Sequence, residues 1–455
     1  MKFRICFLLT GLLACSIISE TQAKAEQPNI VLIISDDQAW TDYGFMGHPA
    51  IKTPNLDQLA KESAVFRRGY VPTALCRPSL ATLMTGHYAS VHGVTGNDPS
   101  PKYAERNSEL YKQRRAQLIS YLDRFETVPE LLGDQGYLSH QSGKFWEGSF
   151  ANGGFTYGMT RGFPKPGGRH GDDGLKIGRE GLDPIAEFVE DATAKEKPFF
   201  IWCAPFLPHT PHNPPKRLLE KYQRPDRPLT VSRYYAMCDW FDETCGQLLE
   251  ILDQNNQREN TLIVYVTDNG WIQNPERNGY APRSKQTPYE GGVRTPIMYS
   301  WPGVIPPGER SEVVSSIDIV PTILAAADAK VPANLPGLNL LPELKSEDPI
   351  ERERIFGESF AHDIADIEDP EKTLLFRWVI EGKWKLLLTY DGEVNRYAST
   401  HPRDEKRPQL FDLIADPEES TNQAAANPEV VARLAREIAR WYPVKSRKTM
   451  TIFEP

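Results

Sequence analysis

Two pairs of oxygen-bearing side chains each follow an apolar run of the sequence. Asp36 and Asp37 come directly after IVLIIS, and Asp268 and Asn269 come directly after LIVYVT. Carboxylate and amide oxygens are preferred ligands of Ca²⁺ and Mg²⁺, whereas Zn²⁺ usually takes His or Cys. Asp and Asn are also common in ordinary turns, so either pair alone is not informative. Together, the two pairs predict one calcium site, with Mg²⁺ as the alternative metal.

A cysteine stands at the start of a predicted helix. Cys76 opens the segment CRPSLATLMTG, in which Pro78 lies at an early helical position and Gly86 lies near the end. Free N–H groups at the start of a helix attract anions and lower the pKa of a thiol. A reactive thiol and a buried structural thiol fit this local pattern equally well.

Three further side chains carry a charge or a titratable ring. They are Lys144 in SGKFW, His209 in PHTPHNPP and Lys285 in SKQTPYEGGVRTP. Cations beside a metal that binds an oxyanion favour the cleavage of sulfate or phosphate esters. Taken singly, each lysine is more typical of a solvated surface, and the histidine of an internally hydrogen-bonded position.

Strands alternate with helices over most of the chain. Buried strands are predicted at IVLII, FFIWCA and LIVYV, and helices begin near Pro54, Val128 and Tyr234. This alternation predicts an α/β fold with a mixed, mostly parallel central sheet that helices cover on both faces. Ligands of such sheets bind at the carboxyl ends of the strands, where both acidic pairs are placed.

The sequence pattern changes near residue 345. Lys345–Arg354 is charged and typical of a linker, and RWVIEGKWKLLLTYDG predicts a hairpin that turns at Glu381 and Gly382. PEVVARLAREIARWY predicts a terminal amphipathic helix. We therefore expect a main domain over residues 26–345 and a small C-terminal α+β subdomain, an antiparallel sheet with a helix, over residues 350–455.

The N-terminus predicts export to the periplasm or the exterior. Residues 1–25 combine a basic start, an apolar run from Phe7 to Ile18 and an A-x-A cleavage site, as in signal peptides. A lipid anchor at Cys15 is the less favoured alternative. No later run reaches about 18 apolar residues, so no transmembrane span is expected.

Composition excludes several other classes of protein. The 455 residues carry a formal net charge of -9, with 40% hydrophobic and 25% charged residues, which is ordinary for a globular chain. The acidic balance argues against general nucleic-acid binding. Cys238 and Cys245 lie two helical turns apart, too far to bridge, and Cys203 lies in a buried strand. We expect all three to be free core residues.

The ordered set of motifs resembles the sulfatase family of the alkaline phosphatase superfamily. The motifs are IISDDQ, CRPSLATLMTG, SGK, PHTP, VTDNG, SKQTPYEGGVRTP, IDIVPT and FDLIADPEE, and they span nearly the whole mature chain. The resemblance implies an alkaline-phosphatase-like fold and the hydrolysis of sulfate esters. The substrate class that it implies is an aryl sulfate or a sulfated glycan.

The resemblance also assigns roles to individual residues. It implies that a maturation enzyme oxidises Cys76 to formylglycine, whose hydrated aldehyde is the nucleophile and offers calcium an oxygen ligand. Lys144 and Lys285 align with sulfate-binding lysines, and His209 with a histidine near the leaving-group oxygen. The remaining implied calcium ligands are Asp36, Asp37, Asp268 and Asn269.

Two positions depart from the family pattern. The signature is Cys-x-Pro-Ser-Arg, but its last position here is Leu80, and the histidine expected two residues after Lys144 is replaced by Trp146. In the family, that arginine helps maturation and supports the nucleophile, and that histidine is associated with the release of sulfate. His170 or Arg169 in GGRHGDDG could substitute for these absent polar groups, and His170 is our candidate for the missing base.

These departures leave two alternative functions open. One is a phosphate mono- or diester hydrolase on the same fold, which usually needs further Asp or His ligands for a second metal. The other is a sulfatase homologue that binds sulfated glycans without turnover.

Overall fold

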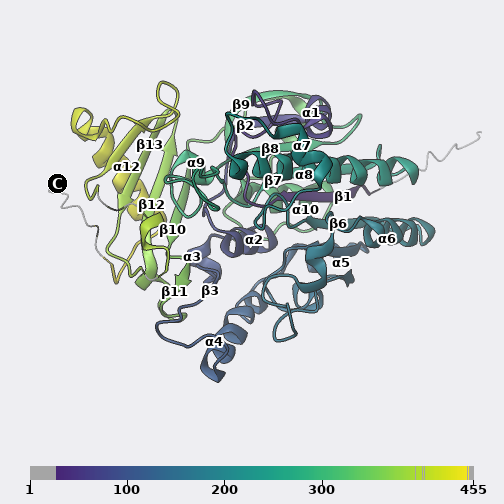
Figure 1. Cartoon of the computed structure of the whole chain (residues 1–455), viewed down its shortest axis with the longest axis horizontal. Coiled ribbons are helices and arrows are strands. Elements are labelled where there is room, and N and C mark those ends of the chain that lie inside the picture. The colour runs from purple at the N-terminus through teal and green to yellow at the C-terminus, as the bar shows by residue number, and fades with distance from the viewer. Residues whose placement is uncertain (1–26, 395, 402, 404, 448, 450–455) are drawn as a thin grey trace, which may run out of the picture.

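The computed structural model describes residues 27–394, 396–401, 403, 405–447 and 449 (Figure 1). Within these residues, an eight-stranded sheet has the order β5-β4-β6-β1-β7-β8-β2-β9. Neighbouring strands are parallel except where β8 pairs with β7 and with β2. The mixed, mostly parallel sheet predicted from the alternation of strands and helices is therefore confirmed. Its strands are β1 (Asn29–Ser35), β2 (Ala64–Tyr70), β4 (Leu138–Gly143), β5 (Tyr157–Gly158), β6 (Phe199–Ala204), β7 (Thr261–Thr267), β8 (Arg294–Ser300) and β9 (Gly308–Ser315).

Helices cover both faces of this sheet, which explains why its central strand, β1, is apolar from Ile30 to Ile34. Ile30 and Leu32 of β1 pack into one apolar cluster, and Val31 and Ile33 pack into another. Successive side chains of a strand point to opposite faces, so a strand covered on both sides needs apolar residues at every position. The first cluster includes residues of α2 (Cys76–Thr85), α5 (Val128–Gly133), α10 (Ile319–Ala326) and α11 (Leu341–Ser346), and the second includes residues of α1 (Pro54–Lys61), α6 (Asp183–Ala194) and α8 (Leu229–Gln254).

Four neighbouring parallel strands end at the same edge of the sheet. They lie in the order β4-β6-β1-β7, and their pairing aligns Gly143 with Ala204, and Ser35 with Thr267. Each of these strands is followed by residues that the sequence predicts to be functional. The topology therefore gathers segments that are far apart in the chain at one edge.

A glycine is required where β4 ends. Gly143 has a φ of 83°, and a Cβ atom there would lie 1.8 Å from the carbonyl oxygen of Ala204. The N–H group of Lys144 donates a hydrogen bond of 2.7 Å to this same carbonyl. The close approach fixes the backbone of Lys144 against β6.

A second sheet forms from the C-terminal part of the described chain, with the antiparallel order β10-β12-β13-β14 (yellow-green in Figure 1). Glu381 pairs with Trp384 across a tight turn in which Gly382 has a φ of 59°, which confirms the predicted hairpin. The predicted terminal helix packs on this sheet. The elements are β10 (Arg354–Phe360), β12 (Leu374–Glu381), β13 (Trp384–Thr389), β14 (Gln409–Asp412) and α12 (Pro428–Trp441).

Short elements connect the two sheets. β3 (Asp98–Pro99) pairs in parallel with β11 (Asp363–Ile364), which brings the segment after β10 next to the segment after α3 (Ala89–His92). α4 (Glu109–Ile119) follows β3, and α7 (Lys216–Tyr222) and α9 (Glu290–Val293) lie in the connections after β6 and β7.

The structure also tests the predictions for the remaining cysteines and for membrane-spanning helices. Cys203, Cys238 and Cys245 are buried and free, as predicted. No helix within the described residues is long and apolar enough to cross a membrane. The predicted signal peptide and the alternative lipid anchor at Cys15 lie outside the described residues.

Candidate active site

The two acidic pairs meet at the carboxyl edge of the sheet. The backbone N–H of Asp37 donates to Oδ1 of Asp268 over 3.0 Å, and Nδ2 of Asn269 donates to Oδ1 of Asp37 over 2.7 Å. Asp36, Asp37, Asp268 and Asn269 are each at most 2% exposed. The structure thus places two segments separated by more than 200 residues in one buried cluster of oxygen atoms.

This cluster fits a hard divalent cation. Four of its buried oxygen atoms have no hydrogen-bond partner within the described chain, and such atoms are costly unless something else binds them. Burial raises the pKa of Asp36 and of Asp268, and the neighbouring carboxylates raise it further. A cation would relieve this repulsion, and a set made only of oxygen atoms suits Ca²⁺ or Mg²⁺. The four atoms are Oδ2 of Asp36, Oδ2 of Asp37, Oδ2 of Asp268 and Oδ1 of Asn269.

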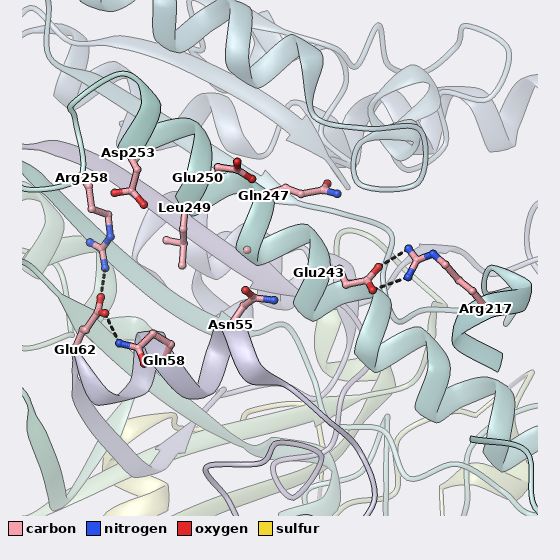
Figure 2. Close-up of a pocket in the computed structure, with 11 residues that line it drawn as sticks. Asn55, Gln58, Glu62, Arg217, Glu243, Gln247, Leu249, Glu250, Asp253 and Arg258 are labelled. Atoms are coloured by element: carbon pink, nitrogen blue, oxygen red, sulfur yellow. Dashed lines mark hydrogen bonds and ion pairs between the residues drawn. The ribbon is translucent and has the colours of Figure 1, made fainter. Parts of the chain in front are cut away.

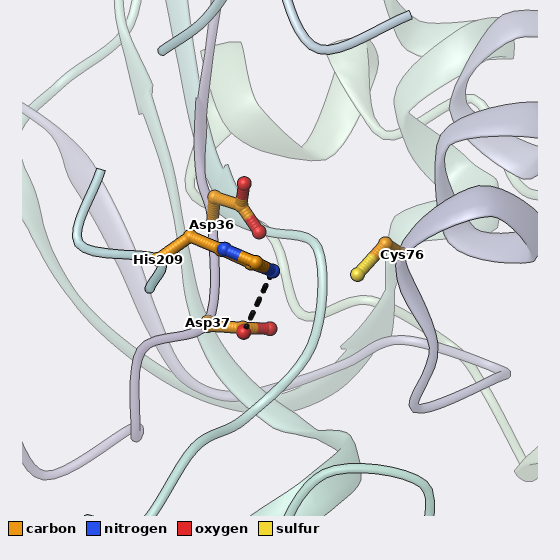
Figure 3. Close-up of side chains that lie close together, drawn as sticks. All are labelled: Asp36, Asp37, Cys76 and His209. Carbon is orange, nitrogen blue, oxygen red and sulfur yellow. Dashed lines mark ion pairs between the residues drawn. The ribbon is translucent and has the colours of Figure 1, made fainter. Parts of the chain in front are cut away.

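Cys76 and His209 face this cluster from two other segments (Figure 3). Cys76 is the first residue of α2, and its sulfur points towards the two aspartates that follow β1. Ligand atoms of Asp36, Asp37, Cys76 and His209 all lie within 4.8 Å of one another. His209 Nε2 lies 3.4 Å from Oδ2 of Asp37. The predicted nucleophile position therefore lies next to the predicted metal ligands.

Two buried lysines complete the charged centre. Lys144 Nζ lies 2.7 Å from Oδ1 of Asp36. Lys285 Nζ lies 2.5 Å from Oδ1 of Asp37 and 2.9 Å from the sulfur of Cys76. Both residues are at most 5% exposed. Two ammonium groups beside three carboxylates create a site that can bind a cation and an oxyanion together.

Burial disfavours the thiolate form of the unmodified Cys76. Burial raises its pKa to about 11, although Lys144 and Lys285 oppose this shift. A thiol needs a lowered pKa to be a thiolate at neutral pH. The raised pKa therefore disfavours the reactive-thiol interpretation for the unmodified side chain, because burial outweighs the favourable position at the start of α2.

His170, the candidate replacement base, lines the same cavity as Cys76. Its ring centre lies 5.2 Å from that of Trp146 and 5.5 Å from that of Phe206. Burial lowers the pKa of His170 to about 3, and Lys144 lowers it further, so the ring is neutral. Its Nδ1 atom has no partner within the described chain.

The cavity above the charged centre has a volume of about 210 Å³. It is smaller than the roughly 300–1,000 Å³ typical of sites for drug-sized ligands, so it matches a small group such as one sugar ring. Its walls include aromatic side chains that lie outside the sequence motifs, two in the connection between β7 and α9 and one between β13 and β14. They are Trp271, Tyr280 and Tyr397.

A hydrogen-bonded network that reaches the segment between β10 and β11 supports the start of α2. Asn97 Oδ1 accepts from the backbone N–H of Arg77, and Asn97 Nδ2 lies 3.2 Å from Nε2 of His362. Arg77 also makes a two-pronged ion pair with Glu147, with both bonds at 2.6 Å. These partners are 20 to 265 residues apart in sequence, so no local pattern could indicate them.

Leu80 occupies the last position of the helix signature. It is 3% exposed and belongs to the apolar cluster under the sheet. The position that carries an arginine in the family pattern therefore contributes to core packing here, while Arg77 in the same turn forms the buried ion pair with Glu147.

A larger hollow of about 650 Å³ lies between α1 and α8, away from this centre (Figure 2). Glu243 pairs with Arg217 there, and Glu62 pairs with Arg258. The described residues that line it include no histidine, lysine or cysteine. The smaller cavity is therefore the candidate active site, because its lining combines Asp37 of the acidic cluster, both lysines and Cys76.

The fold and the site together define an α/β protein with a buried acidic centre beside two lysines. Residues 28–329 match the family described as Sulfatase, and residues 283–442 match N-sulphoglucosamine sulphohydrolase, C-terminal. The chain therefore belongs to the sulfatase family, a class of sulfuric ester hydrolases.

Sequence relatives agree with this assignment. Human N-acetylgalactosamine-6-sulfatase is 30% identical over 360 residues, which cover 70% of this chain and 66% of the relative. Human arylsulfatase A is 29% identical over 476 residues, which cover 90% of this chain and 87% of the relative.

The crystal structure of Ps i-CgsB has the same fold. Its TM-score is 0.70 at 26% identity, and the match covers 91% of this chain and 92% of that chain. A further structure is that of Ps i-CgsB in complex with k-i-k-neocarrahexaose. The alkaline-phosphatase-like fold with an additional antiparallel sheet, predicted from the motifs, is confirmed.

Proposed function

We propose that the protein hydrolyses a sulfate ester of a sugar, with calcium in the acidic cluster and a formylglycine derived from Cys76 as the nucleophile. The observation that carries this proposal is the position of Cys76. Its sulfur is 2.9 Å from the ammonium group of Lys285, and it lies beside the unpartnered oxygens of Asp36 and Asp37.

The calcium and the hydrated aldehyde would supply Lewis acidity and a nucleophilic oxygen at neutral pH. The chain itself binds the sulfate group through Lys144 and Lys285, whose ammonium groups hold the negative charge of its oxygens. Burial of both lysines strengthens these interactions, because water screens them less there.

His209 is the proposed proton donor to the leaving oxygen. A carbonyl can only accept, so Nδ1 of His209 donates to the backbone oxygen of Thr210, at 2.6 Å. This bond turns Nε2 towards the acidic cluster, 3.4 Å from Oδ2 of Asp37. Burial lowers the pKa of His209, so Nε2 must first take up a proton, as an imidazolium that Asp37 stabilises, before it can deliver that proton to the leaving oxygen. Phe206 stacks on the ring at 4.4 Å between centres and holds it in place.

A sugar fits the cavity better than a polymer lying across an open surface. The cavity holds roughly one ring, and aromatic walls such as Trp271 and Tyr280 suit the apolar face of a sugar. Relatives named for sugar sulfates, and the complex of Ps i-CgsB with k-i-k-neocarrahexaose, support a sulfated glycan as the substrate class. The predicted signal peptide supports an exported enzyme that meets such glycans outside the cytoplasm.

The two alternatives make different demands on the site. A phosphate ester hydrolase with two metals needs a second set of ligands. Among the described His, Cys, Asp and Glu side chains, one group is arranged to hold a metal. A homologue without turnover would use both lysines to bind sulfate, but it would not need Cys76 beside the acidic cluster and Lys285. We therefore favour the hydrolase of sulfate esters.

The test is release of inorganic sulfate by the exported protein, made in a host that matures sulfatases. Nitrocatechol sulfate and a panel of sulfated monosaccharides are compared with nitrophenyl phosphate. We expect sulfate release that is lost in Cys76→Ala and retained in Cys203→Ala, a buried cysteine on β6 outside the cavity. Preferred hydrolysis of the phosphate ester, or binding of sulfated sugars without release of sulfate, would contradict the proposal.

A further inference from the structure

Three arginines among the described residues share the carboxylate of Asp98 at one wall of the active-site cavity. Arg115 Nη1 donates to Oδ1 over 2.6 Å, and Arg169 approaches with both Nε and Nη2. Arg106 lies 4.0 Å from the same carboxylate. Burial alone would raise the pKa of Asp98. The cations of Arg169 and Arg115 outweigh burial and lower this pKa below its ordinary value, so the carboxylate is ionised.

The charges of this cluster do not balance. Asp98 supplies one negative charge to three guanidinium groups, which are always protonated. The nearby ion pairs do not supply another, because Glu147 is held by Arg77 and Asp363 by Arg396. Arginines crowded in this way repel one another, and an anion that binds from solution relieves this repulsion through charge-assisted hydrogen bonds.

Arg169 is the member of the cluster that reaches the cavity. It lines the same space as Cys76, its side chain is 34% exposed, and its Nη1 atom makes no hydrogen bond within the described part of the chain. Its guanidinium carbon lies 4.6 Å from the ring centre of Trp146, which supports it from one side. Arg115 donates to its backbone oxygen and fixes the loop.

A second, independent observation comes from Trp146, which lines the same cavity. Its side chain is almost fully buried, and its Nε1–H has no acceptor among the described residues. An indole N–H can only donate, and a buried donor without an acceptor is costly. An anion bound at Arg169 would supply the missing acceptor.

We propose that Arg169 and Trp146 form a subsite for a second anionic group on the substrate. This inference rests on the proposed function and narrows it. The substrate is an acidic sugar that carries, besides the sulfate to be cleaved, another sulfate or a carboxylate on the same or the adjoining ring. A guanidinium group binds either anion through paired hydrogen bonds, and the small cavity keeps the two anions close together.

The test measures binding without turnover. Calorimetry is done on the full chain carrying Cys76→Ala, in calcium, with galactose 6-sulfate, galactose 2,6-disulfate and glucuronic acid 2-sulfate as probes. We expect one of the doubly charged sugars to bind about 10- to 100-fold more tightly than the singly charged one. Whichever sugar binds more tightly identifies the second group as sulfate or carboxylate.

Variants assign this preference to the subsite. Arg169→Gln should reduce the preference to less than about threefold, and Arg169→Lys should keep part of it, because the charge remains but the paired geometry is lost. Arg161→Gln is the matched control, since Arg161 pairs with Asp173 outside the cavity lining. Circular dichroism checks that each variant is folded.

Two results would overturn the subsite. One is equal affinity for singly and doubly charged sugars in the Arg169 protein, and the other is an unchanged preference in folded Arg169→Gln. Because binding is measured without turnover, these results are separate from a failure of the unmutated enzyme to release sulfate, which would contradict the proposed function.

Discussion

The ammonium nitrogen of Lys285 lies 2.9 Å from the sulfur of Cys76, although 209 residues separate the two in the sequence. The loop that carries Lys285 is held at both ends by Glu419, which belongs to the C-terminal part of the chain. Arg283 donates to the backbone oxygen of Glu419, and the N–H of Glu290 donates to its carboxylate, each over 2.7 Å. The C-terminal part therefore helps to position a lysine of the active site.

A buried triad links this support to the second sheet, and it can be tested with Lys385→Met. Lys385 is 0% exposed and lies 2.9 Å from both Glu290 and Glu419. Removing the cation leaves Glu419 without its cation and Glu290 with only Arg294, 3.5 Å away, which should lower the free energy of unfolding by about 3–5 kcal/mol. Urea unfolding measures this loss, and kcat should also fall because the Lys285 loop is less well held.

The matched control is Lys383→Met, on the same hairpin. Lys383 is 51% exposed and pairs with Asp412 at the surface, so its loss should cost less than about 1 kcal/mol. Equal stabilities of the two variants would show that the buried triad does not support the loop.

Metal binding is tested by Asp268→Ala. This change removes one of the unpartnered oxygens and a hydrogen bond to the backbone of Asp37. We expect the purified variant to lose calcium in elemental analysis and to lose all sulfate release. Asp253→Ala is the control, because Asp253 lies in the separate hollow beside α8. A folded Asp268→Ala protein with unchanged metal content would rule out this ligand assignment.

The role of His170 is tested by His170→Ala. If His170 is the general base, this substitution should lower kcat by about 100- to 10,000-fold and leave the metal content unchanged. Since the pKa of His170 is about 3, the ring is unprotonated at neutral pH and releases no proton as the pH rises. The reduction should therefore be the same at each pH between about 5 and 9. Unchanged turnover in the variant would remove His170 from the mechanism.

The pH dependence of stability is tested at Glu358, far from the metal cluster in the second sheet. Burial raises the pKa of Glu358 from 4.5 to about 7. The folded state then holds a proton that the unfolded chain has lost, so this contribution is complete below pH 4.5 and disappears as the pH rises through 7. Unfolding measured at several pH values should show a loss on the order of 3 kcal/mol.

Replacing the carboxyl by an amide should remove that loss. We expect Glu358→Gln to be more stable than the parent protein at alkaline pH, with a flatter pH profile. Glu353→Gln, at an exposed position, should leave the profile as it was. A parent-like profile in Glu358→Gln would mean that Glu358 is ionised in the folded state.

The fold was predictable because its determinants are local. The apolar run of β1 and the alternation of strands with helices require a sheet that is covered on both faces. The sites that follow β1 and β7 were predictable for the same reason, since parallel strands bring their carboxyl ends to one edge. The order of motifs then added Cys76 and Lys285, which lie outside these strand ends.

The remaining parts of the site depend on contacts between distant segments. Asp98 meets Arg169 across 71 residues, and Asn97 meets His362 across 265, so no local spacing indicates either contact. The effect of burial on Cys76 was also not predictable, because its raised pKa depends on how completely the surrounding chain covers the thiol.

The most direct test of the account is the mass of the peptide that contains Cys76, taken from protein that releases sulfate. The account predicts the mass of the aldehyde that oxidation of Cys76 produces, in a fraction of molecules that rises and falls with specific activity. Recovery of only the free thiol from fully active protein would contradict the proposed nucleophile.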